Sequence, residues 1–156
     1  MEYMIMPFKR YFDFNGRSRR MEYWMFTLLN IIVAAVLAGP AYYSIFSNAM
    51  AAGGGEPDMA ASMGGLGTGG TIGLSLYGLY ALAAFIPGIM VAIRRLHDRN
   101  MSGWWLLGFV VLSLIPLLGI FASIAMLVIF FLPGTNGPNR FGDDPKNPSA
   151  QADVFD

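Results

Sequence analysis

Three short polar segments carry most of the side chains of this chain that could do chemistry. Their sequences are FNGRSRRMEYW at residues 14–24, RRLHDRNMSGWW at 94–105 and PGTNGPNRFGDDP at 133–145. Proteins bind phosphates and other anions with converging arginines, because each guanidinium presents several N–H donors in a fixed fork. The candidate residues for binding a ligand or lipid headgroup are therefore Arg17, Arg19, Arg20, Glu22, Arg94, Arg95, His97, Asp98, Asn139 and Arg140.

The same arginines also have a purely structural interpretation. Arginines at the inner edge of a membrane fix topology, reach toward lipid phosphates and pair with carboxylates such as Glu22 and Asp98. Glu22 falls at a predicted helix start, and Arg94 and Arg95 fall at a predicted helix end, where the helix dipole favours those charges. The sequence leaves the structural and the binding role open.

Catalysis has less support from these residues. His97 and Asp98 are adjacent, so on a helix their side chains point in different directions, and no nucleophile motif accompanies them. The chain has no Cys and one His, so we expect no metal site and no cofactor. We predict a non-enzymatic protein; an enzyme acting on a lipid-linked substrate, with His97 and Asp98 as acid and base, remains an alternative.

The elements that position these segments follow from where charge is missing. Of the 156 residues, 55% are hydrophobic and only 13% charged, and ten basic residues balance ten acidic ones. This balance argues against nucleic acid as a partner. No charged residue lies between Glu22 and Glu56, between Asp58 and Arg94, or between Arg99 and Arg140. The pattern predicts a single all-α integral membrane domain over residues 1–156.

Two of these gaps predict full membrane spans. Residues 23–46 and 71–93 are each long enough as a helix to cross about 30 Å of hydrocarbon. Pro87 and Gly88 predict a kink near the end of the second span. The Gly-, Ala- and Met-rich residues 47–70 predict a flexible outer loop between the spans.

The third gap, residues 103–132, has two interpretations. As one straight helix it would measure about 45 Å and need a steep tilt. Pro116 and Gly119 divide it near the middle, which favours a helical hairpin over a single bent span. With the hairpin, the fold becomes a bundle of about four transmembrane helices, and residues 133–156 form a polar tail.

The basic residues predict the orientation of the chain. Lys and Arg are concentrated before the first span and in the loop at 94–102, whereas the outer loop has none. The N-terminus is therefore expected in the cytoplasm, and the hairpin brings the C-terminus to the same side. A short interfacial helix is expected at residues 8–14, because Phe8, Tyr11 and Phe12 share one face.

Taken in order, the three polar segments resemble the bacterial inner-membrane family called domain of unknown function 805. The resemblance covers residues 14–145 and implies a small multi-pass protein of four short helices without an assigned activity. The family pattern falls on Gly16, Arg17, Arg19, Arg20, Glu22, Tyr23, Trp24, Arg94, Arg95, Leu96, His97, Asp98, Ser102, Gly103, Trp104, Asn139, Arg140, Phe141, Gly142 and Pro145. The long Gly- and Met-rich outer loop departs from it.

Two further hypotheses concern partners. If the arginines bind a ligand, the expected partners are membrane lipids, a small anion or another protein at the cytoplasmic edge. The alternative is a subunit of a small-molecule transporter or channel, because broken helices often aim their ends at substrates in mid-membrane. Small residues four apart, such as Ala34 and Ala38, would allow close helix packing in the protomer or in a homo-oligomer.

Overall fold

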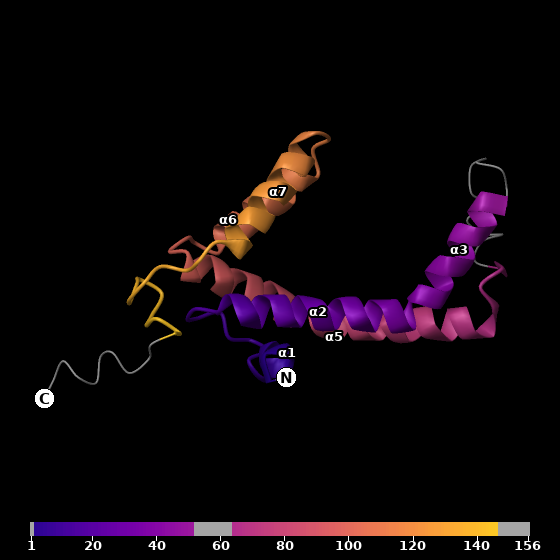
Figure 1. Ribbon diagram of the computed structural model, residues 1–156, viewed down its shortest axis with the longest axis horizontal. Helices are drawn as coiled ribbons and strands as arrows, with labels where there is room; N and C mark the ends of the chain where they lie inside the picture. Colours follow the sequence, from indigo (N-terminus) through magenta and orange to yellow (C-terminus); the bar gives the residue numbers. More distant parts are fainter. Residues whose placement is uncertain (1, 52–63, 147–156) are drawn as a thin grey trace, which may run out of the picture. The chain divides into compact units, whose positions relative to one another are not determined.

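The computed structural model describes residues 2–51 and 64–146. Over these residues the chain forms helices and no strand; Asn139 and Gly142 make one isolated bridge pair. The all-α fold predicted from the sequence is confirmed. The helices labelled in Figure 1 are α1 (Glu2–Lys9), α2 (Arg20–Leu37), α3 (Gly39–Ala51), α5 (Gly67–Asp98), α6 (Trp104–Ser113) and α7 (Leu118–Phe131).

Two of the described helices are long and apolar enough to cross a membrane. These are α2, with 18 residues, and α5, with 32 residues. At 1.5 Å per residue they measure about 27 Å and about 48 Å. The apolar helices α6 and α7 are shorter, with 10 and 14 residues.

The first predicted span, residues 23–46, is not one helix. It divides into α2 and α3 at Ala38, a residue in a turn. Pro40 explains the division, because a proline inside a helix removes a hydrogen bond and clashes with the preceding turn. In the first turn of α3 the missing N–H of Pro40 has no such cost. By contrast, α5 continues through Pro87.

Two predicted boundaries near the polar segments also differ. The N-terminal helix covers Glu2–Lys9 instead of residues 8–14, and Phe8 at its end packs edge-on against Phe26 at 5.4 Å. Residues 94–98 of the predicted loop 94–102 are still helical, as the last turn of α5. Cations at a helix C-terminus are favoured by the dipole, which accounts for this extension.

Both ends of the predicted outer loop, residues 47–70, are helical in the structure. Helix α3 continues to Ala51 and α5 begins at Gly67. The intervening residues 52–63 lie outside the described part of the chain.

Residues 103–132 turn back on themselves instead of forming one bent helix. Helices α6 and α7 pack against each other and are joined by residues 114–117 (Figure 1). Leu117 has φ +70° and ψ −53°, and Leu118 N–H donates to the Pro116 carbonyl at 2.9 Å. This is a γ-turn, a strained conformation for a residue other than glycine.

The chain divides into two compact units. Unit 1 comprises Met1–Phe26 with Ile86–Asp156, and unit 2 comprises Thr27–Phe85. In unit 2, a Cβ on Gly73 would collide with the Leu37 carbonyl, and one on Gly70 would lie 3.7 Å from Ala41 Cα. The helices of unit 2 therefore approach each other at glycines, whose lack of a side chain allows close backbone packing.

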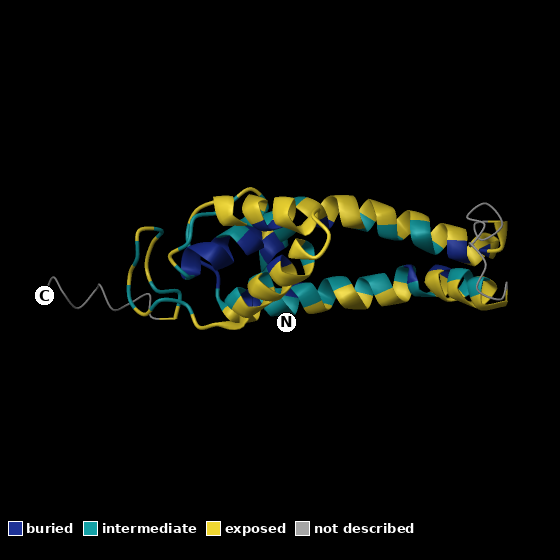
Figure 2. Cartoon of the chain, turned by 90° about the horizontal axis from the view of Figure 1, so that it is seen from above, coloured by how far each residue is buried: buried dark blue, intermediate teal, exposed yellow. Residues whose placement is uncertain are grey.

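Unit 1 has a small apolar core beside its polar segments. Ala92, Leu96 and Phe130 are buried, and six further apolar side chains pack around them. The surrounding residues are Tyr23, Trp24, Met101, Leu106, Met126 and Ile129. Buried residues are concentrated near the C-terminal part of α5, whereas most of the other helical surface is exposed (Figure 2).

Candidate functional site

The last turn of α5 carries four of the candidate residues, namely Arg94, Arg95, His97 and Asp98. It ends in a Schellman motif around Asn100, which has φ +58°. Asn100 N–H donates to the His97 carbonyl and Met101 N–H to the Leu96 carbonyl, at 2.9 and 3.0 Å. Asparagine tolerates this left-handed conformation better than most residues, so the sequence itself fixes where α5 ends.

Asp98 is shared by two arginines. Arg17 approaches Asp98 Oδ1 with Nε at 3.0 Å and Nη2 at 2.9 Å, and Arg95 Nη1 binds Oδ2. Arg95 is 0% exposed, Asp98 3% and Arg17 5%. Charges this deeply buried are tolerated only when they are paired and hydrogen-bonded. One carboxylate therefore holds two cations from distant parts of the chain.

Arg94 makes the second buried ion pair. Its Nη2 lies 2.9 Å from Glu22 Oε1, and its Nη1 donates to the Asp13 carbonyl at 2.8 Å. Ser18 N–H donates in turn to the Arg94 carbonyl at 3.2 Å. Arg94 thus binds the start of α2 and the segment before it to the end of α5. We call Arg17, Glu22, Arg94, Arg95 and Asp98 the buried arginine cluster.

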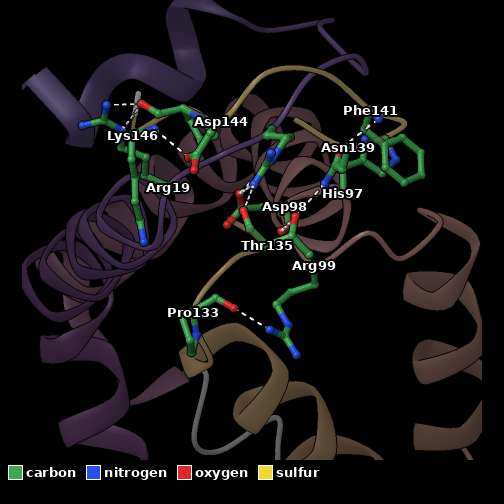
Figure 3. A network of polar contacts seen from close by, with 12 residues as sticks. Arg19, His97, Asp98, Arg99, Pro133, Thr135, Asn139, Phe141, Asp144 and Lys146 are labelled. Carbon is green, nitrogen blue, oxygen red and sulfur yellow. Dashed lines mark hydrogen bonds and ion pairs between the residues drawn. The ribbon is translucent and has the colours of Figure 1, made fainter. Parts of the chain in front are cut away.

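Three arginines also cap the C-terminus of α7. Arg95 Nε donates to the Phe130 carbonyl at 3.3 Å, and its Nη2 donates to that of Leu132. Arg20 donates to the Phe131 carbonyl at 3.2 Å, and Arg99 to that of Pro133 (Figure 3). The final carbonyls of a helix have no partner within it. Cations there satisfy these carbonyls and match the negative end of the dipole.

The tail at 133–146 closes over the cluster through its backbone. Arg17 donates to the Thr135 and Gly137 carbonyls, at 2.5 and 2.6 Å, and Thr135 N–H donates to the Asp98 carbonyl at 2.8 Å. Arg19 Nε donates to the Pro145 carbonyl at 2.6 Å. All three predicted polar segments therefore meet in unit 1.

Gly134 permits the closest approach in this region. A Cβ at this position would overlap the carboxylate of Asp98. No larger residue fits at this position unless the tail moves, so Gly134 sets the distance between the tail and the cluster.

His97 lies beside the cluster and stacks on an aromatic ring. Its ring stacks on Phe141 with centroids 3.9 Å apart and planes at 4°, and its Nδ1 lies 3.3 Å from the Gly16 carbonyl (Figure 3). Asn139 donates to the His97 carbonyl at 3.0 Å, and the guanidinium of Arg140 lies 4.7 Å from the Phe141 ring centre. These contacts fix His97 as a packing residue.

Asp144 stabilises the turn of the tail. Its carboxylate accepts the N–H of Lys146 at 2.9 Å and the N–H of Gly137 at 3.1 Å (Figure 3). The hydrogen bond from Lys146 is the main cause that holds the pKa of Asp144 below its usual 3.8, and Gly137 and the charge of Arg17 add to it. The carboxylate is therefore ionised at any physiological pH.

The candidate residues separate by exposure. The buried arginine cluster, with His97, points into the protein, whereas Arg20 and Arg140 are exposed and Arg19 is half-buried. Asn139 is half-buried and binds within the chain. Over the described residues, no three His, Asp or Glu side chains are placed to hold a metal ion together.

Sequence reasoning missed Gly134 and Thr135 as members of the site. The signal for Gly134 is its place in the Pro-Gly pair at the start of the third polar segment. Thr135 contributes mainly its backbone N–H and carbonyl, which any residue type supplies, so no sequence signal could have identified it.

Unit 1 carries a small excess of positive charge. It contains all ten basic residues of the chain and eight acidic ones, which leaves a formal charge of +2. The eight are Glu2, Asp13, Glu22, Asp98, Asp143, Asp144, Asp153 and Asp156. A small α-helical membrane protein with a buried arginine cluster and a surplus of exposed cations is therefore the class that the fold and the site define.

Comparison with known proteins places the chain in a family. The family model described as "Protein of unknown function (DUF805)" matches residues 11–143. The inner membrane protein YhaI of Escherichia coli is 38% identical over 149 residues, which cover 94% of this chain and 97% of YhaI. The inner membrane protein YhaH of the same organism is 36% identical over 146 residues, covering 94% and 98%. No solved structure matches. The chain belongs to the DUF805 family.

Proposed function

We propose that the protein is a non-enzymatic inner-membrane protein whose arginine-rich edge binds anionic lipid headgroups at the cytoplasmic surface. The observation that carries the proposal is that unit 1 contains all ten basic residues, has a formal charge of +2, and exposes Arg20 and Arg140. Within the buried arginine cluster, two carboxylates offset two of the three arginine charges. The cations outside it face the surroundings beside apolar helices, as in proteins that bind acidic lipids.

Arg20 and Arg140 are the cations best placed for this role. Each is exposed and donates one hydrogen bond to a backbone carbonyl, Arg20 to Phe131 and Arg140 to Asn100. A guanidinium has five N–H donors, so both retain donors for a phosphate. Lys9 and Lys146 are exposed in the same unit and add to the positive field.

We assign a structural role to the buried candidate residues. Arg17, Arg94 and Arg95 donate to protein carboxylates and carbonyls, so we assign them to holding the polar segments together. The same holds for His97 and Asp98, whose contacts with Phe141, Gly16 and the two arginines favour packing over proton transfer. Among the described residues, the two acid–base candidates of the enzyme alternative, His97 and Asp98, are both held in packing contacts.

The transporter alternative loses its main argument. It depended on a broken helix that aims its ends at a substrate. The break at residues 114–117 is the turn of a hairpin. Leu114 and Ile115 donate to carbonyls at the end of α6, and Leu118 and Gly119 donate to carbonyls of the turn. No specific observation favours transport over lipid binding.

Lipid retention in mild detergent tests the proposal. Purified protein is expected to carry phosphatidylglycerol or cardiolipin, detected by native mass spectrometry, in preference to phosphatidylethanolamine. The double variant Arg20→Gln, Arg140→Gln removes two surface cations, each worth about 1 kcal/mol near an acidic surface. Retention of anionic lipid should weaken up to about thirtyfold.

Asp143→Asn is the matched control, because it changes one exposed charge of opposite sign in the same tail. This variant should retain as much anionic lipid as the natural chain, or more. Equal retention of anionic and zwitterionic lipid by the natural chain would contradict the proposal. So would a double variant that retains its anionic lipid while the protein remains folded.

A further inference from the structure

The α6–α7 hairpin is too short to reach the far side of a bilayer. Helix α7 has 14 residues and α6 has 10, which correspond to about 21 Å and about 15 Å. The hydrocarbon core measures about 30 Å. With the base of the hairpin at one edge of the core, neither arm covers the whole thickness.

The base of the hairpin is held at the level of the arginines. Arg20, Arg95 and Arg99 bind the carbonyls of residues 130–133 at the end of α7. Moving these guanidiniums into hydrocarbon is costly, so the end of α7 stays at the membrane edge. Trp104 and Trp105, both exposed, lie at the start of α6, and tryptophan favours the interface.

The arms and the turn have the chemistry of a segment surrounded by lipid. Residues 103–132 contain no charged side chain. The side chains of Leu114, Ile115, Leu117 and Leu118 at the turn are 45–78% exposed. A turn that emerged on the far side would place these four apolar side chains in water.

Four of the five N–H groups at the turn, all except that of Leu117, make the hydrogen bonds that hydrocarbon requires. In lipid, every peptide N–H must find a partner within the protein. Leu114, Ile115, Leu118 and Gly119 donate to the carbonyls of Val111, Leu112, Pro116 and Ile115, at 2.8–3.2 Å. Pro116 has no N–H to satisfy. The strained conformation of Leu117 is part of the geometry that closes these bonds.

From these observations we propose that the hairpin is re-entrant: it enters and leaves the bilayer at the face that holds the arginine cluster, and its turn ends among the acyl chains. The partner of this surface is the hydrocarbon of one leaflet. Only α2 and α5 then cross completely among the described helices, and the predicted count of four spans becomes two spans and a hairpin. The proposal does not depend on headgroup binding by Arg20 and Arg140.

Cysteine accessibility tests the depth of the turn, because the chain contains no native cysteine. Leu114→Cys and Ile115→Cys place single thiols at the turn. Thr68→Cys, near the start of α5, and Asn136→Cys, in the tail, mark the two faces, and both residues are exposed. Each variant is reconstituted into vesicles and treated with a membrane-impermeant maleimide from one side and then from both.

The expected result is loss of labelling at the turn under native conditions. Thr68→Cys and Asn136→Cys should react from opposite sides, whereas Leu114→Cys and Ile115→Cys should react only after denaturation in SDS. A bimane attached to the turn should be quenched more by lipids spin-labelled near the chain ends than by lipids labelled at the headgroup.

Either alternative pattern of labelling overturns the proposal. Reaction from the side of Thr68→Cys would show that the hairpin crosses the membrane. Reaction from the side of Asn136→Cys would show that the turn lies outside the hydrocarbon. The two turn positions are independent reporters, so if one variant does not accumulate, the other still decides.

Discussion

Unit 1 and unit 2 place their polar groups in opposite ways. In unit 1, Arg94 and Arg95 are fully buried, and Asp98 is 3% exposed. The described residues of unit 2 contain no Asp, Glu, Lys or Arg, and apolar side chains such as Leu79 and Leu82 are 67% and 74% exposed. The buried charges of unit 1 follow the general rule that charged side chains are almost never fully buried unless they are paired.

This difference teaches how each unit is stabilised. In a membrane, burying an apolar side chain between two helices gains little free energy, because the surrounding lipid tails are equally apolar. Unit 2 therefore depends on close backbone approach at glycines. Unit 1 depends on matching a limited number of carboxylates and carbonyls to buried guanidiniums. Substitutions should therefore destabilise the two units for different physical reasons.

Removing the shared carboxylate of unit 1 should have the largest effect. Asp98→Asn leaves Arg17 and Arg95 buried without a counter-charge, and the loss of one partner of a buried pair costs about 3–5 kcal/mol. SDS-induced unfolding in mixed micelles, followed by circular dichroism, measures this change. Asp143→Asn, at an exposed acid, should change the unfolding free energy by less than about 0.5 kcal/mol. Equal effects of the two variants would break the contrast between the units.

A methyl group at Gly134 should disturb the same unit sterically. Its Cβ would overlap the Asp98 carboxylate, and overpacking of a closed site costs about 1–3 kcal/mol or more. Gly134→Ala should therefore lower the unfolding free energy in the same assay and loosen the tail, seen as faster proteolysis after residue 133. Gly108→Ala is the control, since nothing lies within 4 Å of a Cβ there.

Gly73→Ala is the corresponding change in unit 2. Its Cβ would collide with the Leu37 carbonyl, so we expect a loss of about 1–3 kcal/mol. Gly78→Ala lies in the same helix in open space, and should instead gain about 0.5–1 kcal/mol from the higher helix propensity of alanine. If both substitutions act alike, close backbone approach does not hold unit 2 together.

Asn100→Ala tests the end of α5. At φ +58°, alanine is strained in the left-handed conformation, which costs about 1–2 kcal/mol of stability. Asn100→Gly accepts the same conformation without strain and should keep the stability of the natural chain. Thermal unfolding of the two variants in one detergent makes the comparison, and equal losses would contradict the capping role.

The smallest expected effect concerns pH and Asp144. Hydrogen bonds from Lys146 and Gly137 hold the pKa of this carboxyl below its usual 3.8. Since the folded state favours the charged form, the stabilisation is present above the usual pKa and is lost as pH falls through the folded-state value. The difference in stability between the natural chain and Asp144→Asn should be constant above about pH 5 and vanish in stronger acid. A difference that persists at low pH would contradict this role.

The sequence predicted which parts of the chain are apolar and which polar segments matter. Charge gaps identified α2 and α5, and the Pro116–Gly119 pair marked the region where the third stretch turns. The sequence also predicted that Glu22 would pair with an arginine, because carboxylates and guanidiniums attract each other, although it did not specify Arg94. These inferences depend on residue type alone, so one sequence was sufficient for them.

The remaining details depend on groups that residue types do not encode. Arg17, Arg20, Arg95 and Arg99 all bind backbone carbonyls, and every residue has a carbonyl. The extension of α5 to Asp98 required recognition of Asn100 as a cap, not only the count of apolar residues. The N-terminal helix at Glu2–Lys9 lies about one and a half turns earlier than the predicted residues 8–14, since the aromatic spacing locates a face of a helix but not its ends.

The closure of the tail over Arg17 has a consequence for biosynthesis. Arg17 leaves the ribosome more than 110 residues before its acceptors on Thr135 and Gly137. Until those acceptors are made, the donors of Arg17 must bind water or lipid phosphate instead. Folding of this region therefore cannot finish before residues 135–137 are synthesised, even though both membrane-spanning helices precede them.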